Sequence, residues 1–314
     1  MNLKKIFFTL FCAVAALSCF LFVFAASPEE ERLQIDSVVP KLKGRMPAAP
    51  REEWKAREVA IKSASLKGTG RFLIYLPPGY SSSKKEYPVV YFLHGMGDSH
   101  MTWLDGQQEM DRMAALLMED GDAVPMILVA PEGGRGFWSN FKDGSVLYED
   151  WVMKDVFAYI EKNYRVLKKR EGRAVMGVSM GGFGALKIAM RHPEIFGCVC
   201  AIAPAIPPPA LPPGNSALSR IFGSDQDQKY YRRNHPFWLV EEDPAGLRNM
   251  KFILKCGTAD GLYPSVAGYA DFMKNNGMDC RWQAYKDMKH DVFFFRKSSV
   301  DALMQISDFF NKKK

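Results

Sequence analysis

The sequence predicts an α/β fold in which a mostly parallel sheet of eight strands is covered by helices on both faces. Three observations support this prediction. Short apolar runs alternate with amphipathic helical patterns over most of the chain, the later apolar runs are continuous, and no heptad or internal repeat occurs. Continuous apolar runs are typical of strands buried on both faces, and strand–helix alternation is typical of a parallel sheet. The composition, 47% hydrophobic and 25% charged over 314 residues, permits a large core.

The apolar runs and helical patterns define the expected elements in order. Strands are expected at Glu58–Leu66, Arg71–Leu76, Pro88–Leu93, Met126–Pro131, Arg173–Val178, Cys198–Ala203, Lys251–Cys256 and Cys280–Tyr285. Helices are expected at Glu109–Met118, Trp151–Lys162, Gly182–Arg191, Ser265–Asn275 and Val300–Asn311. Because crossovers between parallel strands are right-handed, this order gives one doubly wound domain, whose functional groups lie at the carboxyl ends of the strands.

The segment from Pro204 to Met250 interrupts this alternation. It contains two proline clusters and several aromatic residues in place of the next helix and strand. We expect residues 204–250 to form an insertion after the sixth strand, long enough to lie over the site as a small cap.

Residues 1–25 are expected to be a signal peptide that exports the protein to the periplasm or the medium. Lys4 and Lys5 precede an apolar run from Ile6 to Phe24, and small residues fit cleavage after Ala25. The apolar run is also long enough to remain uncleaved as a membrane anchor. Cleavage before Cys19, as in a lipoprotein, is disfavoured by the residues on either side of it.

Residues 26–57 are polar and contain four prolines, so we expect a linker or a loosely packed arm before a domain spanning residues 58–314. Loss of the first segment lowers the net charge from +7 to +5, and the basic residues are dispersed. No nucleic-acid partner is expected, because a surface that binds nucleic acid would carry a denser cluster of basic residues. A stable membrane partner is expected only if the first segment stays uncleaved, and the oligomeric state is left open.

No cofactor or metal is expected. The sequence contains no P-loop, dinucleotide fingerprint or cluster of metal-ligating residues. Cys198, Cys200, Cys256 and Cys280 have no spacing that indicates a disulfide framework, and buried free cysteines are the commoner outcome for such a pattern.

The stretch Gly177-Val178-Ser179-Met180-Gly181 matches the G-x-S-x-G nucleophile elbow. The motif alone is weak, and a structural glycine turn is the alternative. Its context strengthens it, because a buried-strand pattern precedes the serine and a helical pattern follows it. We therefore predict Ser179 as a catalytic nucleophile.

Chain order selects the expected base and acid, since in folds with this elbow the acid and then the histidine follow the serine. Of the five histidines, His290 alone lies far beyond Ser179 and after the candidate acids. A lone surface histidine is the alternative. Asp260 directly follows the seventh strand, at the sheet edge where Ser179 emerges, and is the expected acid. The alternative acids are Glu241, Glu242 and Asp243.

An acyl-transfer site also needs backbone donors for an oxyanion. The residue after the nucleophile, Met180, supplies one, and the loop after the third strand supplies the other. In that loop, Leu93-His94-Gly95-Met96-Gly97-Asp98, we expect the amide of Met96 to donate, with Gly95 as the alternative.

Seven segments occur in the order and spacing of one known family: RFLIYLPPGY, YPVVYFLHGMGD, APEGGRGFWSN, YEDW, GVSMGGFGAL, CGTADGLY and KHDVFFFRKS. From Glu58 to the C-terminus the chain thus resembles the "Putative esterase" family. That family includes S-formylglutathione hydrolases of the esterase D type, tributyrin, feruloyl and acetyl esterases, and mycolyltransferases. The resemblance implies an α/β-hydrolase fold, with Ser179, Asp260 and His290 as the triad and Met96 and Met180 as oxyanion donors.

Two departures from the family pattern leave the subfamily and its substrate open. Asp291-Val292-Phe293 follows the histidine, where the family often has an acidic residue directly before an aromatic one. Ala259 stands beside the expected acid, where the family commonly has a second acidic residue.

We expect aromatic side chains to line the substrate pocket, although each of them also suits a core position. Trp138 and Asn140, in the loop after the fourth strand, are the first candidates for substrate contact, followed by Trp103 and Tyr263.

The sequence therefore predicts an exported serine carboxylesterase that acts through an acyl-enzyme on a short-acyl, acetyl or feruloyl ester. The ester is expected to be a small molecule or linked to a polysaccharide. The alternatives are an acyltransferase of the mycolyltransferase type that uses a sugar or lipid hydroxyl, a non-catalytic carbohydrate- or partner-binding protein, and a peptidase of the prolyl type.

Overall fold

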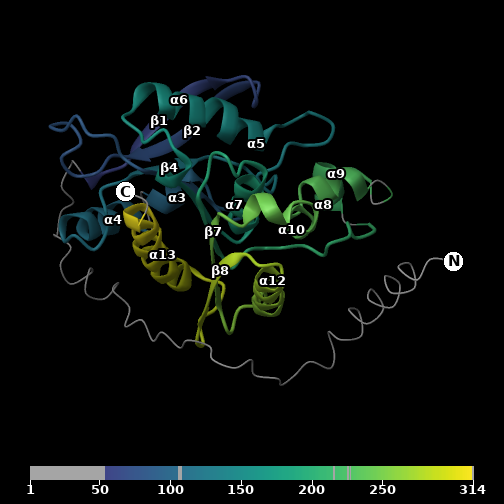
Figure 1. Cartoon of the computed structure of the whole chain (residues 1–314). Coiled ribbons are helices and arrows are strands. Elements are labelled where there is room, and N and C mark those ends of the chain that lie inside the picture. The colour runs from purple at the N-terminus through teal and green to yellow at the C-terminus, as the bar shows by residue number, and fades with distance from the viewer. Residues whose placement is uncertain (1–53, 105–107, 215, 225, 227, 313–314) are drawn as a thin grey trace. The chain divides into compact units, whose positions relative to one another are not determined.

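The computed structural model describes residues 54–104, 108–214, 216–224, 226 and 228–312 (Figure 1). The predicted signal peptide (residues 1–25) and residues 26–53 of the predicted arm lie outside these ranges. Trp54, near the end of that arm, is buried and donates a hydrogen bond from Nε1 to Glu119 Oε1 (3.1 Å). Within the described ranges, no helix combines the length and the apolar character that crossing a bilayer requires.

Eight strands form a sheet in the order β1-β2-β4-β3-β5-β6-β7-β8. They are β1 (Arg57–Ser63), β2 (Gly68–Tyr75), β3 (Val89–Leu93), β4 (Ile127–Pro131), β5 (Arg173–Val178), β6 (Cys198–Ile202), β7 (Lys251–Gly257) and β8 (Asp279–Tyr285). Strand β2 pairs antiparallel with β1 and with β4, and the remaining neighbours pair parallel. The predicted mostly parallel, eight-stranded sheet is confirmed.

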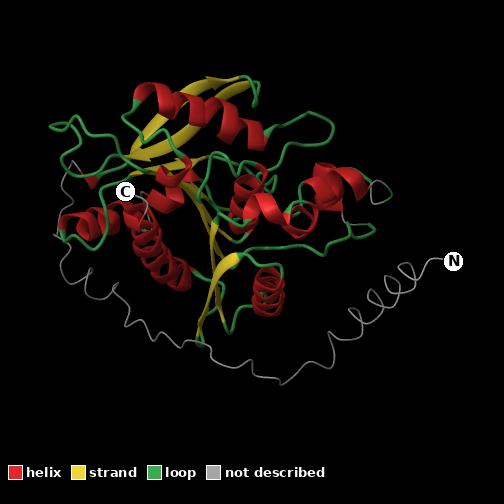
Figure 2. Cartoon of the chain, in the orientation of Figure 1, coloured by secondary structure: helices red, strands yellow, loops and turns green. Residues whose placement is uncertain are grey.

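Helices cover both faces of the sheet (Figure 2). They are α3 (His100–Leu104), α4 (Met110–Glu119), α5 (Tyr148–Asp150), a π-helical segment (Trp151–Val156), α6 (Phe157–Asn163), α7 (Met180–Arg191), α8 (Ser216–Phe222), α9 (Gln228–Arg233), α10 (Pro236–Glu242), α11 (Pro244–Leu247), α12 (Tyr263–Asn275) and α13 (Val292–Lys312). Successive side chains of a strand point to opposite faces. Accordingly Val89, Tyr91 and Leu93 pack in the core with α6 and α7, and Val90 and Phe92 pack in the core with α4 and α13.

The last helix begins eight residues earlier than the sequence predicted, at Val292 instead of Val300. Asp291 Oδ1 accepts a hydrogen bond from the N–H of Phe294 (3.0 Å) and so satisfies a free donor of the first turn. The aromatic run after the predicted base is therefore helical.

The insertion of residues 204–250 contains α8 to α11 and packs against the domain. Its prolines are held by side chains of the same insertion: Tyr231 Oη donates to Pro208 O (2.6 Å), His235 Nε2 to Pro207 O (2.9 Å) and Trp238 Nε1 to Pro209 O (2.7 Å). Tyr231 and Val240 are fully buried in the core that contains α7. The proline segment that follows β6 is thereby fixed in position.

The cysteines Cys198, Cys200, Cys256 and Cys280 are free thiols, and the first three are buried. Burial raises the pKa of Cys200 and of Cys256 to about 12. Both thiols therefore stay protonated and poorly nucleophilic.

A buried ammonium group ties α7 to the loop after β4. Lys187 is fully buried, and its Nζ donates to Trp138 O (2.6 Å), Ser139 Oγ (3.0 Å) and Glu149 Oε2 (2.8 Å). All three of its donors are thus used. The second oxygen of Glu149 accepts from Arg191 Nε (2.8 Å), so the carboxylate is paired on both sides.

Lys187→Met is expected to lower the free energy of unfolding by roughly 3 kcal/mol, because it removes the buried ammonium that pairs with one oxygen of the buried Glu149. Urea denaturation followed by circular dichroism measures this loss. Lys154→Met is the matched control, since the Lys154 ammonium that pairs with Asp150 (2.7 Å) belongs to an exposed side chain. The control is expected to leave the urea midpoint unchanged; equal effects in the two variants would contradict the special role of the buried pair.

Candidate active site

Ser179 lies at the turn between β5 and α7, with φ 53° and ψ −119°. A non-glycine residue in this region is strained, as expected for a nucleophile elbow. Two bonds fix the turn: the Ser179 N–H donates to Ile202 O (2.9 Å), and the Ser179 carbonyl accepts from the Ala205 N–H (2.9 Å). A side chain at Gly181 would collide with the carbonyl of Leu93 at the end of β3. The glycine therefore permits the close packing that places the serine at the sheet edge.

The structure brings the three predicted triad residues together from the ends of three different strands. His290 Nε2 lies 3.0 Å from Ser179 Oγ, and His290 Nδ1 lies 2.6 Å from Asp260 Oδ2. The Asp260 side chain is buried, whereas that of His290 is 35% exposed. The second carboxylate oxygen of Asp260 accepts from the N–H of Leu262 (2.8 Å). This arrangement leaves His290 Nε2 as the acceptor that faces the serine hydroxyl.

The alternative acids lie elsewhere. Glu241 and Glu242 belong to the last turn of α10, and Asp243 follows that helix. Asp243 Oδ1 accepts from the Gly246 N–H (3.0 Å) and so caps α11. The structure places Asp260, and none of these three, at His290.

The two predicted oxyanion donors flank the serine. Met180 is the first residue of α7, so its N–H has no acceptor within the helix. Gly95 lies against the nucleophile, because a Cβ built on it would stand 3.6 Å from Ser179 Cβ. The side chain of the next residue, Met96, is half exposed and is not needed in the core. Met180 therefore directly follows Ser179, and Met96 directly follows a residue that packs against it.

Two predicted substrate contacts are wrong, because their side chains belong to the core. Trp103 is buried and packs edge-on against Phe92, with ring centroids 5.5 Å apart. Trp138 is fully buried and donates from Nε1 to His94 O (3.2 Å). Its φ of 54° turns the loop so that the indole points into the protein instead of toward a substrate.

The other two candidates are half-buried. Asn140 uses its amide to hold the end of α5, because Nδ2 donates to Asp150 Oδ1 (2.9 Å) and Oδ1 accepts from the Asp150 N–H (3.1 Å). Tyr263 begins α12 and packs against Trp282, with ring centroids 5.9 Å apart.

One group that the sequence analysis passed over lies beside the oxyanion loop. Glu132 directly follows β4 and is 3.3 Å from His94 Nε2. It also bonds His100. The rule that selected Asp260, an acidic residue directly after a buried strand, would have found Glu132 as well.

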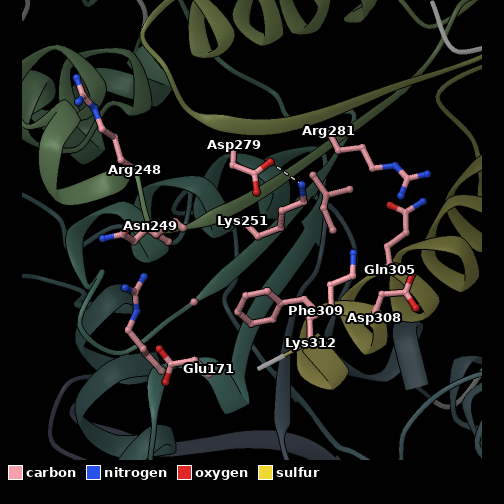
Figure 3. A pocket seen from close by; sticks show the side chains of 14 residues that line it. Glu171, Arg248, Asn249, Lys251, Asp279, Arg281, Gln305, Asp308, Phe309 and Lys312 are labelled. Carbon is pink, nitrogen blue, oxygen red and sulfur yellow. Dashed lines mark hydrogen bonds and ion pairs between the residues drawn. The ribbon is translucent and has the colours of Figure 1, made fainter. Parts of the chain in front are cut away.

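Two cavities differ in their relation to this site. A cavity of about 570 Å³ lies at the amino ends of β6 to β8, opposite the edge that carries Ser179, and acidic and basic side chains alternate around it (Figure 3). Lys251 and Asp279 pair across its wall (2.6 Å). A groove of about 470 Å³ lies at the carboxyl edge, between the proline segment after β6 and α12, and is mainly apolar.

The chain is similar to known esterases in sequence and structure. Residues 63–296 match the family described as "Putative esterase". An esterase of Mycobacterium tuberculosis (strain H37Rv) is 35% identical over 124 residues, which cover 38% of this chain and 25% of that protein. An acetyl esterase of Caldicellulosiruptor saccharolyticus is 23% identical over 279 residues, 80% of this chain and 97% of that one. A solved ferulic acid esterase is 26% identical, with a TM-score of 0.70 over 81% of this chain and 99% of its own. The match thus spans a quarter of the length of the mycobacterial relative.

Proposed function

Because this chain belongs to the family described as "Putative esterase" and is an ester-hydrolysing enzyme, we propose that it is an exported serine carboxylesterase. One observation carries the assignment of Ser179, His290 and Asp260. The imidazole of His290 lies within hydrogen-bond distance of both Ser179 Oγ and Asp260 Oδ2. This is the geometry that activates a serine hydroxyl.

The reaction has two halves. Ser179 Oγ attacks the ester carbonyl as its proton passes to His290 Nε2, and the carbonyl electrons move onto an oxyanion near the amides of Met96 and Met180. Collapse expels the alcohol, which takes the proton from His290, and leaves an acyl group on Ser179. Water then gives a proton to His290 Nε2 as its oxygen bonds to the acyl carbon. The bond between Ser179 Oγ and that carbon breaks, Oγ takes the proton back from His290, and the free acid leaves. Asp260 stabilises the imidazolium in both halves.

The apolar groove is the proposed site for the acyl group. Its wall begins at Ile206, whose neighbour Ala205 is hydrogen-bonded to the carbonyl of Ser179 (2.9 Å). Its floor contains Phe237 and Phe272, stacked with centroids 4.4 Å apart. Such a surface suits an aromatic or extended aliphatic acyl group. The similarity to a ferulic acid esterase supports the same substrate class.

Gly268→Leu is expected to lower kcat/KM for feruloyl or octanoyl esters by about tenfold, the order for one contact in an apolar pocket. Gly268 lines the groove, and a Cβ on it would meet no atom within 4 Å. A leucine therefore extends into the groove and shortens it. Acetyl esters are expected to keep their kcat/KM within about twofold. Rates for matched nitrophenyl esters measure the difference.

Gly268→Ala is the control, because it adds only one methyl group to the same helix. Equal losses for acetyl and feruloyl esters in Gly268→Leu would contradict the assignment of the groove to the acyl group.

The export part of the proposal rests on the N-terminal pattern of two lysines, an apolar run and small residues before residue 26. The reaction is tested with a panel of acetyl, butyryl and feruloyl esters, with and without sugar acceptors. Free acid as the main product in every case supports hydrolysis. Acylated sugar as the main product would assign the chain to acyl transfer.

A further inference from the structure

The carbonyl of Gly95 is anchored by the residue before it. His94 Nδ1 lies 2.8 Å from Gly95 O. A carbonyl oxygen only accepts hydrogen bonds, so Nδ1 must carry the proton. The His94 ring is fully buried, and the backbone carbonyl of His94 accepts a hydrogen bond from Trp138 Nε1 (3.2 Å). The backbone of His94 is therefore held by Trp138, while its ring donates to the carbonyl of Gly95.

This anchor determines the direction of a predicted oxyanion donor. The Gly95 carbonyl and the Met96 N–H belong to the same peptide unit, which is planar and trans, so they point in opposite directions. With the carbonyl fixed on the buried His94, the Met96 N–H points away from that core. The Gly95 carbonyl also accepts from the Asp98 N–H (3.3 Å), so His94 is one of two donors that fix this peptide plane.

The other ring nitrogen of His94 is held through Glu132. The N–H of Gly133 lies 3.0 Å from His94 Nε2 and 3.2 Å from Glu132 Oε1. The N–H of Gly134 donates to the same carboxylate oxygen (2.9 Å). Glu132 thus orders the backbone that contacts His94.

Glu132 is in turn fixed by an imidazolium. His100 donates from its backbone N–H (3.2 Å) and from Nδ1 (2.9 Å) to Glu132 Oε2. Its Nε2 donates to Glu58 Oε1 (2.9 Å) on β1, which also pairs with Arg71 (2.9 Å). Partial burial lowers the pKa of His100, but the hydrogen bonds with Glu132 and Glu58 outweigh this and raise it. Both ring nitrogens of His100 are donors, as these partners require.

We propose that Glu132 is a positioning residue for the oxyanion hole, and that it sets the direction of the Met96 N–H through Gly133 and His94. The inference rests on the proposed function, because it assigns a supporting role in that reaction. This position requires a carboxylate, because both oxygens of Glu132 accept hydrogen bonds and neither side needs a donor. An amide at this position must turn its NH₂ group toward one set of donors.

The test measures the strength of the oxyanion hole directly. An aryl trifluoromethyl ketone labelled with ¹³C at the carbonyl adds to Ser179: the Oγ–carbon bond forms, the carbonyl electron pair moves to oxygen, and the serine proton passes to His290. The ¹³C shift of this adduct as a function of pH gives the pKa of its oxyanion. Better-aligned donors give a lower oxyanion pKa.

Glu132→Gln is expected to raise the oxyanion pKa by about one unit and to lower kcat by about tenfold, with KM for an acetyl ester within about twofold of the wild-type value. His100→Gln is the second variant, and it is expected to shift both quantities in the same direction by less. It leaves the Glu132 side chain in place, so it stays informative if Glu132→Gln fails to fold.

Glu161→Gln is the matched control. Glu161 is a half-buried carboxylate of α6 that pairs with Arg173 (3.0 Å). Arg173 begins β5 and so lies at the opposite end of this strand from Ser179. It is expected to leave the oxyanion pKa unchanged, even if the melting temperature falls. Folded Glu132 and His100 variants with a wild-type oxyanion pKa would overturn the inference, as would an equal shift in the control. Failure of the wild-type enzyme to form the adduct on Ser179 would instead overturn the proposed nucleophile, and the inference with it.

Discussion

Ser179→Ala is expected to reduce kcat for ester hydrolysis by roughly 10⁶, the loss found when a serine triad loses its nucleophile. The substitution removes the oxygen that lies 3.0 Å from His290 Nε2. It leaves intact the backbone bonds of residue 179 to Ile202 and Ala205, which form the turn. The melting temperature should therefore stay close to that of the wild-type protein.

Initial rates with nitrophenyl butyrate measure this loss, and labelling by a fluorophosphonate probe, mapped by mass spectrometry, locates the nucleophile. Ser81→Ala, at an exposed loop position, is the control and is expected to keep full activity and labelling. Undiminished turnover by a folded Ser179→Ala protein would show that another group attacks the ester. A folded wild-type protein that forms no adduct would favour the non-catalytic alternative.

Asp260→Asn is expected to reduce kcat by about 10⁴ while the fold persists. One oxygen of Asp260 accepts from the Leu262 N–H (2.8 Å), and an asparagine oxygen would keep that bond. The asparagine NH₂ group then faces His290 Nδ1, where an acceptor now stands 2.6 Å away. His290 must adopt the other tautomer, with its proton on Nε2 and directed at Ser179. In that form it cannot take the serine proton.

The pH-independent kcat of Asp260→Asn measures this effect. Asp287→Asn is the control: Asp287 is exposed, lies three residues before His290 and has φ 58°, a conformation that asparagine tolerates. It is expected to keep kcat within about twofold, since it removes a charge without touching the imidazole. If Asp260→Asn retains more than a tenth of the activity, the assignment of Asp260 as the catalytic acid is wrong.

Strands β3 to β7 were predictable from the sequence because buried strands leave continuous apolar runs. The start of α13 was not, because Phe293 and its neighbours have strand-like propensity, and the helix depends on the cap by Asp291. Ser179, Asp260 and His290 were found by chain order and by position at strand ends; their catalytic roles stay predictions. The burial of Trp138 depends on two successive residues with positive φ, Phe137 and Trp138, for which no local pattern exists.

In the proposed function, selectivity and chemistry depend on different stretches of this chain. The predicted nucleophile, acid and base follow strands whose register is set by the whole sheet, so their spacing tolerates little change. The wall of the apolar groove belongs largely to the insertion of residues 204–250, which joins two neighbouring strands and contributes no strand to the sheet. A different insertion on the same sheet would change which acyl group is accepted while the elbow remains as it is. The substrate range of such a scaffold can diverge through this segment alone.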